Sequence, residues 1–245
     1  MAASYDTIGV NYSDLRKPDT RIARLISSAL GSADTVLNVG AGTGSYEPVD
    51  RAVTAIEPSG EMISQRSASA APVIQGCAED LPFDDNSFDA SMAILTVHHW
   101  TDKEKGLSEM RRVTRGPVVV VTYDPAFRAF WLLGYFPQLV TLDEGQMPKL
   151  TDYEKWLGPV EISPVPIPHD CTDGFLSAYW RRPAAYLDPR VRAAMSPFWA
   201  LGDVSAQLDR LEKDLASGAW QQQNSELLDL DARDCGYRLV VNGSI

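Results

Sequence analysis

The segment VLNVGAGTGSYE, residues 36–47, runs from apolar residues directly into three glycines, Gly40, Gly42 and Gly44. In a doubly wound α/β sheet the turn after the first strand faces the ligand, and glycine lets backbone N–H groups approach it without an intervening Cβ. Glu57 ends the next apolar run, thirteen residues after Gly44, where a carboxylate can accept hydrogen bonds from both hydroxyls of a ribose. Strand, glycine turn and acid in this order indicate a site for a nucleoside-containing cofactor.

Further short apolar runs predict the remaining strands of a sheet. The runs lie at 35–39, 52–56, 72–75, 87–97 and 117–123. Their hydrophobicity is continuous rather than alternating, which is typical of parallel strands covered on both faces. Apolar residues at helical spacing over 19–30 predict one covering helix, and a capping box of Thr101 and Glu104 predicts the start of another. We therefore expect an α/β, doubly wound, Rossmann-like sheet.

The character of the chain changes after the run that ends at Tyr123. Aromatic residues crowd 127–140, prolines punctuate 161–170, and the patterns at 203–217 and 237–242 predict a helix and a last strand. We expect one domain in which insertions cover the substrate as a cap. Its residues are 1–245, with a core of about 19–123, 159–168 and 236–245 and insertions of about 124–158 and 171–235.

The composition of the chain argues against nucleic acid, membrane and metal as binding partners. The 245 residues carry a formal net charge of −11 and no cluster of Lys and Arg, so we expect the protein to repel nucleic acid. No secretory signal is visible, and no apolar run approaches the roughly 18 residues of a membrane span. We expect a cytoplasmic protein without membrane contact, in which Cys77, Cys171 and Cys235 are reduced. Their spacing does not fit zinc, so we expect no metal, and the oligomeric state is left open.

Position 45 discriminates between nucleoside cofactors. The dinucleotide fingerprint requires glycine there, and Ser45 therefore disfavours pyrophosphate binding and an NAD-dependent oxidoreductase. The segment instead resembles motif I of the class I S-adenosylmethionine-dependent methyltransferases, whose usual form is V-L-D-x-G-x-G-x-G. AIEPSGEM, GCAEDLPFDDNSFD and AILTVHHW resemble the second, third and fourth motifs of the type 11 branch, in family order. The resemblance covers residues 5–123 and implies a seven-stranded sheet that binds S-adenosylmethionine.

The resemblance also implies roles for individual residues. The glycine turn would lie against the methionine part of the cofactor, Glu57 on the ribose and Met62 against the adenine. Ala78 and Glu79 would read the adenine edge, and Ile94 lies where the family offers a backbone carbonyl to the cofactor amino group. The implied cofactor-binding residues are Tyr12, Arg16, Gly40, Ala41, Gly42, Gly44, Glu57, Pro58, Met62, Cys77, Ala78, Glu79 and Ile94.

Two positions depart from the family pattern. Asn38 replaces the usual Asp of motif I, and Cys77 replaces an Asp that often bonds the adenine amino group, which shifts the expected contact to Glu79. Upstream, YDTIGVNYSDLRKPD resembles the N-terminal lid of the branch, in which a Tyr and an Arg approach the methionine carboxylate. Tyr12 and Arg16 are one helical turn apart and can face the same way, although a solvated helix face is the alternative.

His98 and His99 are the predicted catalytic residues. They follow the fourth predicted strand at the carboxyl edge of the sheet, and an imidazole titrates near neutrality. A base is needed only if the methyl acceptor must lose a proton. The alternative is that one histidine packs at the strand end while the other only lines the pocket.

The insertions are expected to recognise a small methyl acceptor. Their flat aromatic side chains favour a planar substrate, although such side chains often form a local core instead. The candidate substrate-binding residues are Tyr5, Asp124, Trp131, Tyr135, His169, Asp170, Tyr179 and Trp180. We therefore expect N- or O-methylation of a heteroaromatic metabolite in natural-product biosynthesis. C-methylation of the quinone type, or a relative that binds the cofactor without catalysis, are the alternatives.

Overall fold

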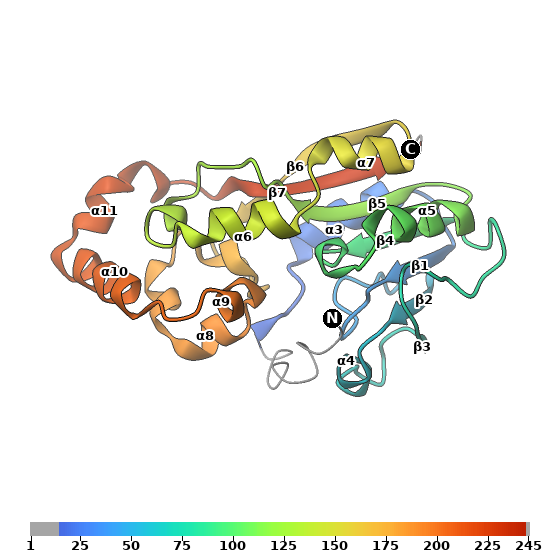
Figure 1. The fold of residues 1–245 in the computed structure, drawn as a ribbon, viewed down its shortest axis with the longest axis horizontal. Coiled ribbons are helices and arrows are strands. Elements are labelled where there is room, and N and C mark those ends of the chain that lie inside the picture. Colours follow the sequence, from blue (N-terminus) through green and yellow to red (C-terminus); the bar gives the residue numbers. More distant parts are fainter. Residues whose placement is uncertain (1–14, 244–245) are drawn as a thin grey trace.

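The computed structural model describes residues 15–243, which build one seven-stranded sheet (Figure 1). Its strand order is β3-β2-β1-β4-β5-β7-β6. Strands β1 to β5 are parallel, whereas β7 runs antiparallel between β5 and β6. The bounds are β1 Thr35–Val39, β2 Ala52–Glu57, β3 Val73–Gln75, β4 Ala90–Ile94, β5 Val118–Tyr123, β6 Val160–Pro168 and β7 Ala232–Asn242. The predicted doubly wound, Rossmann-like α/β fold is confirmed.

Helices cover the sheet and build most of the cap. The α-helices are α3 Thr20–Ala29, α4 Gly60–Ser64, α5 Lys103–Val113, α6 Gln138–Gln146, α7 Leu150–Leu157, α8 Pro189–Ala193, α9 Ser196–Ala200, α10 Ser205–Ser217 and α11 Ala219–Gln223. The 3₁₀ turns are η1 Val97–His99, η2 Trp131–Gly134, η3 Leu176–Tyr179, η4 Pro183–Leu187 and η5 Ser225–Leu227.

The sheet is buried on both faces, as the continuous hydrophobicity of its strands predicts. On β5, Val119 and Val121 belong to the core that contains the buried side of α3, whereas Val118 and Val120 belong to the core that contains α5 and α7. Alternate residues of β5 therefore pack into the two hydrophobic cores on opposite faces of the sheet. Removal of apolar surface from water on both faces supplies most of the driving force for this sheet.

The sequence locates most elements, and three of the boundaries that differ have a clear physical reason. β4 ends at Ile94 because Leu95 turns into the left-handed region, with φ of 54°, ahead of η1. The cap of α5 is Asp102 rather than Thr101, since the Asp102 side chain accepts the Lys105 N–H. β7 begins at Ala232, where polar residues that carry no apolar signal pair with the edge strand β6.

The cap has a core of its own. Figure 1 shows α6 and α8 to α11 gathered beyond the end of the sheet at which β7 begins. The Trp131 ring makes edge contacts with Tyr135, Tyr186 and Trp220, at centroid distances of 5.9, 5.7 and 5.2 Å. Helix α7 lies instead on the sheet beside α5, and the partition into core and insertions stays a prediction.

Candidate functional site

The glycine turn lies at the carboxyl ends of β1 and β2. Gly40, Gly42 and Gly44 all have positive φ, of 70°, 53° and 94°, which glycine adopts without strain. The N–H groups of Gly40 and Ala41 both donate to the carbonyl of Ile56, at 2.8 and 3.0 Å. A Cβ on Gly40 would lie 2.1 Å from the Thr96 Oγ1. Each glycine is therefore required by conformation, and Gly40 also by a close approach.

Glu57 is buried beside this turn and holds its backbone. Its Oε2 accepts the Gly42 N–H at 2.7 Å, and its Oε1 accepts the Ser59 N–H at 2.9 Å. Glu57 therefore fixes the backbone on both sides of the place where the resemblance puts the ribose. Ser59 in turn caps α4 and thereby places the buried Met62, whose Cε would lie 3.4 Å from a Cβ on Gly42. The structure thus brings turn, acid and Met62 together.

Three polar side chains, Asn38, Glu47 and Arg66, form a cluster that contacts the glycine turn and that the sequence alone did not indicate. Arg66 donates to the carbonyl of Gly42 at 3.0 Å and to Glu47 Oε1 at 2.7 Å. Asn38 donates its amide to the same Glu47 oxygen at 3.1 Å. An Asp at position 38 would place a second carboxylate beside Glu47, and the Asn therefore suits this site.

The third-motif residues lie on the loop that follows β3. Cys77 is exposed, Ala78 is buried, and Glu79 Oε1 accepts the backbone N–H groups of Thr101 and Asp102 at 2.9 and 3.0 Å. Glu79 thereby fixes the loop between η1 and α5. Pro58 is exposed and Ile94 is half-buried. The roles of these residues toward the cofactor stay predictions.

Arg16 connects the segment before α3 to the cap. Its Nε donates to Asp173 Oδ1 at 2.6 Å, and the Tyr46 hydroxyl donates to Asp173 Oδ2 at 2.8 Å. Asp173 is 1% exposed, and Tyr46 follows the glycine turn closely in sequence. One cap carboxylate thus joins the lid segment to the cofactor turn. Tyr12 and Tyr5 lie outside the described residues.

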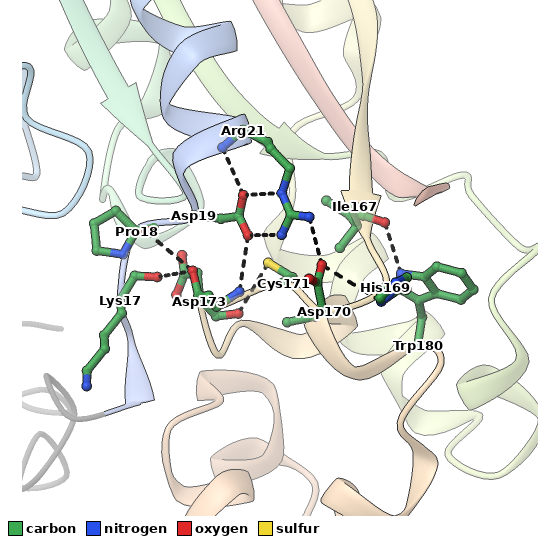
Figure 2. Close-up of polar contacts among 12 residues, drawn as sticks. Lys17, Pro18, Asp19, Arg21, Ile167, His169, Asp170, Cys171, Asp173 and Trp180 are labelled. Atoms are coloured by element: carbon green, nitrogen blue, oxygen red, sulfur yellow. Dashed lines mark hydrogen bonds and ion pairs between the residues drawn. The ribbon is translucent and has the colours of Figure 1, made fainter. Parts of the chain in front are cut away.

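A second set of carboxylates fastens the same segments (Figure 2). Arg21 donates to both oxygens of the buried Asp19 and to the exposed Asp170. Asp19 also accepts the Thr172 N–H at 3.2 Å. The Arg21 hydrogen bonds hold the pKa of Asp19 far below its usual range. His169 lies at the surface with its Nδ1 3.8 Å from Asp170.

A cavity opens between the sheet and the cap, next to these contacts. It encloses about 570 Å³ of empty space, its open mouth included. The lining residues are Arg16, Leu95, His98, Tyr123, Asp143, Met147, Phe175, Leu176, Met195, Ser196, Pro197 and Tyr237. Since Leu95 and Tyr123 follow or end parallel strands, the cavity is at the carboxyl edge of the sheet, where such folds bind ligands.

Four ionisable groups of this cavity have shifted pKa values, and His98 and Asp143 are the two whose shifts bear on protonation near pH 7. Desolvation, then the nearby His99, Lys103 and Arg16, lower the pKa of His98 well below its usual value. His98 is therefore neutral near pH 7. Burial raises the pKa of Asp143 to about 7, against the opposing effect of Arg128. The His99 ring lies beside that of His98, with centroids 3.9 Å apart and the planes tilted by 45°, and His99 is the more exposed of the two.

The described substrate candidates lie elsewhere. Trp131 and Trp180 donate their indole N–H groups to the carbonyls of Trp180 and Ile167, and Tyr135 donates to Asp214. These side chains pack on one another as the core of the cap, so their polar atoms already have partners. The candidates that do not line the cavity described above are Asp124, Trp131, Tyr135, His169, Asp170, Tyr179 and Trp180. Their roles as substrate contacts stay predictions.

Asp143 has a sequence signal that was missed. It stands four residues after Leu139 of α6 and four before Met147, the residue that ends this helix, so a carboxylate occupies a position at apolar helical spacing. The other unpredicted lining residues come from segments far apart in the chain, and only the folded cap brings them together.

Two searches of residues 15–243 complete the description. No helix there is long and apolar enough to span a membrane. The same part of the chain has no group of three or more His, Cys, Asp or Glu side chains placed to hold a metal ion.

Known proteins share both this fold and the motifs. Residues 37–121 match the family model described as a methyltransferase domain. A crystal structure from Anabaena variabilis, described as a candidate methyltransferase from an antibiotic biosynthesis pathway, is 34% identical and superposes with a TM-score of 0.85. The alignment covers 94% of this chain and 99% of that one.

Curated relatives match a shorter part of the chain. The 2-methyl-6-phytyl-1,4-hydroquinone methyltransferase 2 of Oryza sativa subsp. japonica is 27% identical over 62% of this chain and 47% of its own length. The ubiquinone/menaquinone biosynthesis C-methyltransferase of Geotalea daltonii is 30% identical over 54% of this chain and 60% of its own. The chain thus spans about half the length of the curated relatives it matches.

Proposed function

Because this chain belongs to the class I S-adenosylmethionine-dependent methyltransferases, we propose that it methylates a nitrogen or oxygen of a small, planar heteroaromatic metabolite. The observation that carries this proposal is the cavity between sheet and cap, which is lined by Arg16 and by residues at the ends of β4 and β5, on the same edge of the sheet as the glycine turn. The description of the Anabaena variabilis protein supports a place in natural-product biosynthesis.

The residues of the turn fit the cofactor that the family implies. Bulkier residues than glycine would strain the turn, and Glu57 places a carboxylate, the usual acceptor for ribose hydroxyls, beside it. Met62 offers an apolar surface for the adenine. When bound, S-adenosylmethionine would supply an electrophilic sulfonium methyl group: the acceptor lone pair would bond to the methyl carbon as the C–S bond breaks, and that bond's electron pair would stay on the sulfur of the leaving S-adenosylhomocysteine.

The chain's own residues align the acceptor and exclude water. The rings of Tyr123, Tyr237 and Phe175 form an aromatic wall. The ring centroid of Tyr237 lies 5.4 Å from that of Tyr123 and 4.8 Å from that of Phe175. Such a wall suits a planar acceptor, and positioning alone can supply a large part of the rate enhancement. Neutral His98 can take the proton that an N–H or O–H acceptor releases.

C-methylation of a quinol is the second candidate, because both curated relatives bear names of that class. A radiolabelled methyl-transfer screen separates the two. We expect transfer to heteroaromatic amines or phenols and little to prenylated hydroquinones, and the reverse ranking would favour the quinol. Transfer only to a macromolecule would overturn the acceptor class.

The cofactor site is tested by calorimetry with S-adenosylmethionine and NAD. We expect binding of the first alone, weakened at least ten-fold in Glu57→Gln, about 1.4 kcal/mol, because charge-assisted hydrogen bonds are lost. Glu104→Gln, on the exposed side of α5, is the matched control. Unchanged affinity in Glu57→Gln would contradict its place on the ribose, and a cofactor-binding protein without any transfer would favour the non-catalytic alternative.

A further inference from the structure

Asp143 is a buried carboxylic acid without a partner among residues 15–243. It is 5% exposed, and within that range no hydrogen bond or ion pair reaches its carboxyl group. Arg128, the nearest charge that acts on it, binds instead to Glu144 and to the carbonyl of Pro125. Buried polar groups are normally satisfied, so an unpaired carboxyl at this position is costly to the folded protein.

The place of Asp143 in α6 indicates why a carboxyl is kept there. Leu139, one turn earlier on the same stripe, is fully buried, and Met147, one turn later, lines the cavity with Asp143. A leucine at 143 would continue the apolar stripe. The carboxyl group instead faces the space that the proposed function assigns to the methyl acceptor.

The other polar groups of the cavity do not satisfy Asp143. Arg16 is held by Asp173, and His98 is a neutral ring near pH 7. The phenols of Tyr123 on β5 and Tyr237 on β7 lie near enough for the carboxylate to raise their pKa values, after the larger effect of burial. From the described part of the protein, Arg128 is the cation that acts on it, and its side chain is engaged elsewhere.

We propose that Asp143 accepts a hydrogen bond from the methyl acceptor, which is therefore a mainly apolar ring compound carrying an N–H or O–H donor. The inference rests on the proposed function and adds a chemical requirement to it. The donor would replace the partner that Asp143 lacks, and an isosteric compound without a donor would leave the carboxyl buried and unpaired.

Three probes on one scaffold test this requirement: 2-naphthol, 2-naphthylmethylamine and 2-methylnaphthalene. Binding to the protein saturated with S-adenosylhomocysteine is measured by ligand-observed NMR titration. We expect at least one donor probe to bind ten-fold more tightly than 2-methylnaphthalene. The hydroxyl and ammonium probes distinguish a neutral from a cationic donor. Equal binding of all three, or binding of none, overturns the proposal.

Substitutions test whether the tighter binding of the donor probes depends on Asp143. In Asp143→Leu the preference should fall below three-fold, whereas Thr141→Leu, two residues away on the exposed side of α6, should keep it. Asp143→Leu should also melt at a higher temperature than the parent at pH 8, because it removes an unpaired buried charge. A retained preference, or a clearly lower melting temperature, would show that Asp143 serves the fold instead.

Calorimetry with S-adenosylmethionine on the same preparations separates this inference from the proposed function. Loss of donor preference with intact cofactor binding would reject the role of Asp143 alone. A parent protein that does not bind the cofactor would reject the proposed function itself.

Discussion

Two side-chain-bearing residues at the site adopt a backbone conformation that glycine usually occupies. Tyr46 has φ of 64° and Leu95 has φ of 54°. Such conformations cost roughly 1–3 kcal/mol each and persist only where the surroundings hold them. Asp173 holds Tyr46 through its hydroxyl, and the Val121 carbonyl holds the Leu95 N–H at 2.9 Å. The site residues are therefore positioned by their neighbours rather than by local preference.

Gly42→Leu should abolish binding of S-adenosylmethionine while the fold is retained. The side chain would start from a left-handed position and project toward Met62, into the space assigned to the cofactor. Gly202→Leu is the matched control, because Gly202 has φ of 68° and nothing within 4 Å of its Cβ position. Both variants lose roughly 1–2 kcal/mol of stability from strain. Calorimetry and circular dichroism check this, and cofactor affinity that survives in Gly42→Leu would contradict the assigned turn.

Asp143 should make stability depend on pH in a way that Asp143→Asn does not. Its folded pKa of about 7 exceeds the ordinary 3.8, so the folded protein binds the proton more tightly than the unfolded chain. The resulting stabilisation is complete below about pH 4 and is lost as pH rises through 7, on the order of 4 kcal/mol in total.

The measurement is the difference in unfolding free energy between the parent and Asp143→Asn, taken from pH 5 to pH 8. The difference cancels the opposite contribution of His98, whose lowered pKa adds stability as pH rises toward 6.5. A difference independent of pH would mean that the carboxyl group titrates as an exposed one.

At the scale of the element, the sequence predicted those strands and turns that are determined by residues next to one another in the chain. The apolar runs located β1 and β5 closely, and the glycines and Glu57 were visible because one strand end positions each of them. The first five residues of β7 could not be predicted from the sequence. They form no apolar run, and the backbone, rather than the side chains, pairs this segment with β6. The cavity lining could not be predicted, because η3, α6 and α9 meet β5 only in the folded cap.

Tyr153 links α7 to the sheet, and its hydroxyl should contribute measurably to stability. It is fully buried and donates to the Thr122 Oγ1 of β5 at 2.9 Å. Tyr153→Phe removes this bond and should cost about 1 kcal/mol without changing cofactor affinity. A double-mutant cycle with Thr122→Val, followed by urea unfolding, isolates the pair. Strictly additive effects would show that the bond contributes nothing.

At the scale of the whole molecule, one carboxylate joins three parts of the chain. Asp173 of the cap accepts from Arg16 before α3 and from Tyr46 after the glycine turn. Neutralising Asp173 would remove a buried ion-pair partner of Arg16, whose side chain is 13% exposed. The cap, lid segment and cofactor turn are therefore coupled through a single side chain.

Asp173→Asn should destabilise the protein by roughly 3 kcal/mol or more. Asp170→Asn is the control, since Asp170 also pairs with an arginine across the same segments but is 58% exposed, and little change is expected there. Urea unfolding followed by fluorescence measures both. Equal effects of the two substitutions would mean that burial of Asp173 does not matter.

The antiparallel strand β7 has a consequence for biosynthesis. Ala232 of β7 follows Tyr123 of β5 by 109 residues, so the ribosome exposes β5 and then the entire cap before the strand that separates β5 from β6 emerges. Until then the nascent chain presents an apolar, unpaired edge, which is a template for aggregation. The enzyme's yield in the cell therefore depends on how that edge is shielded while synthesis continues.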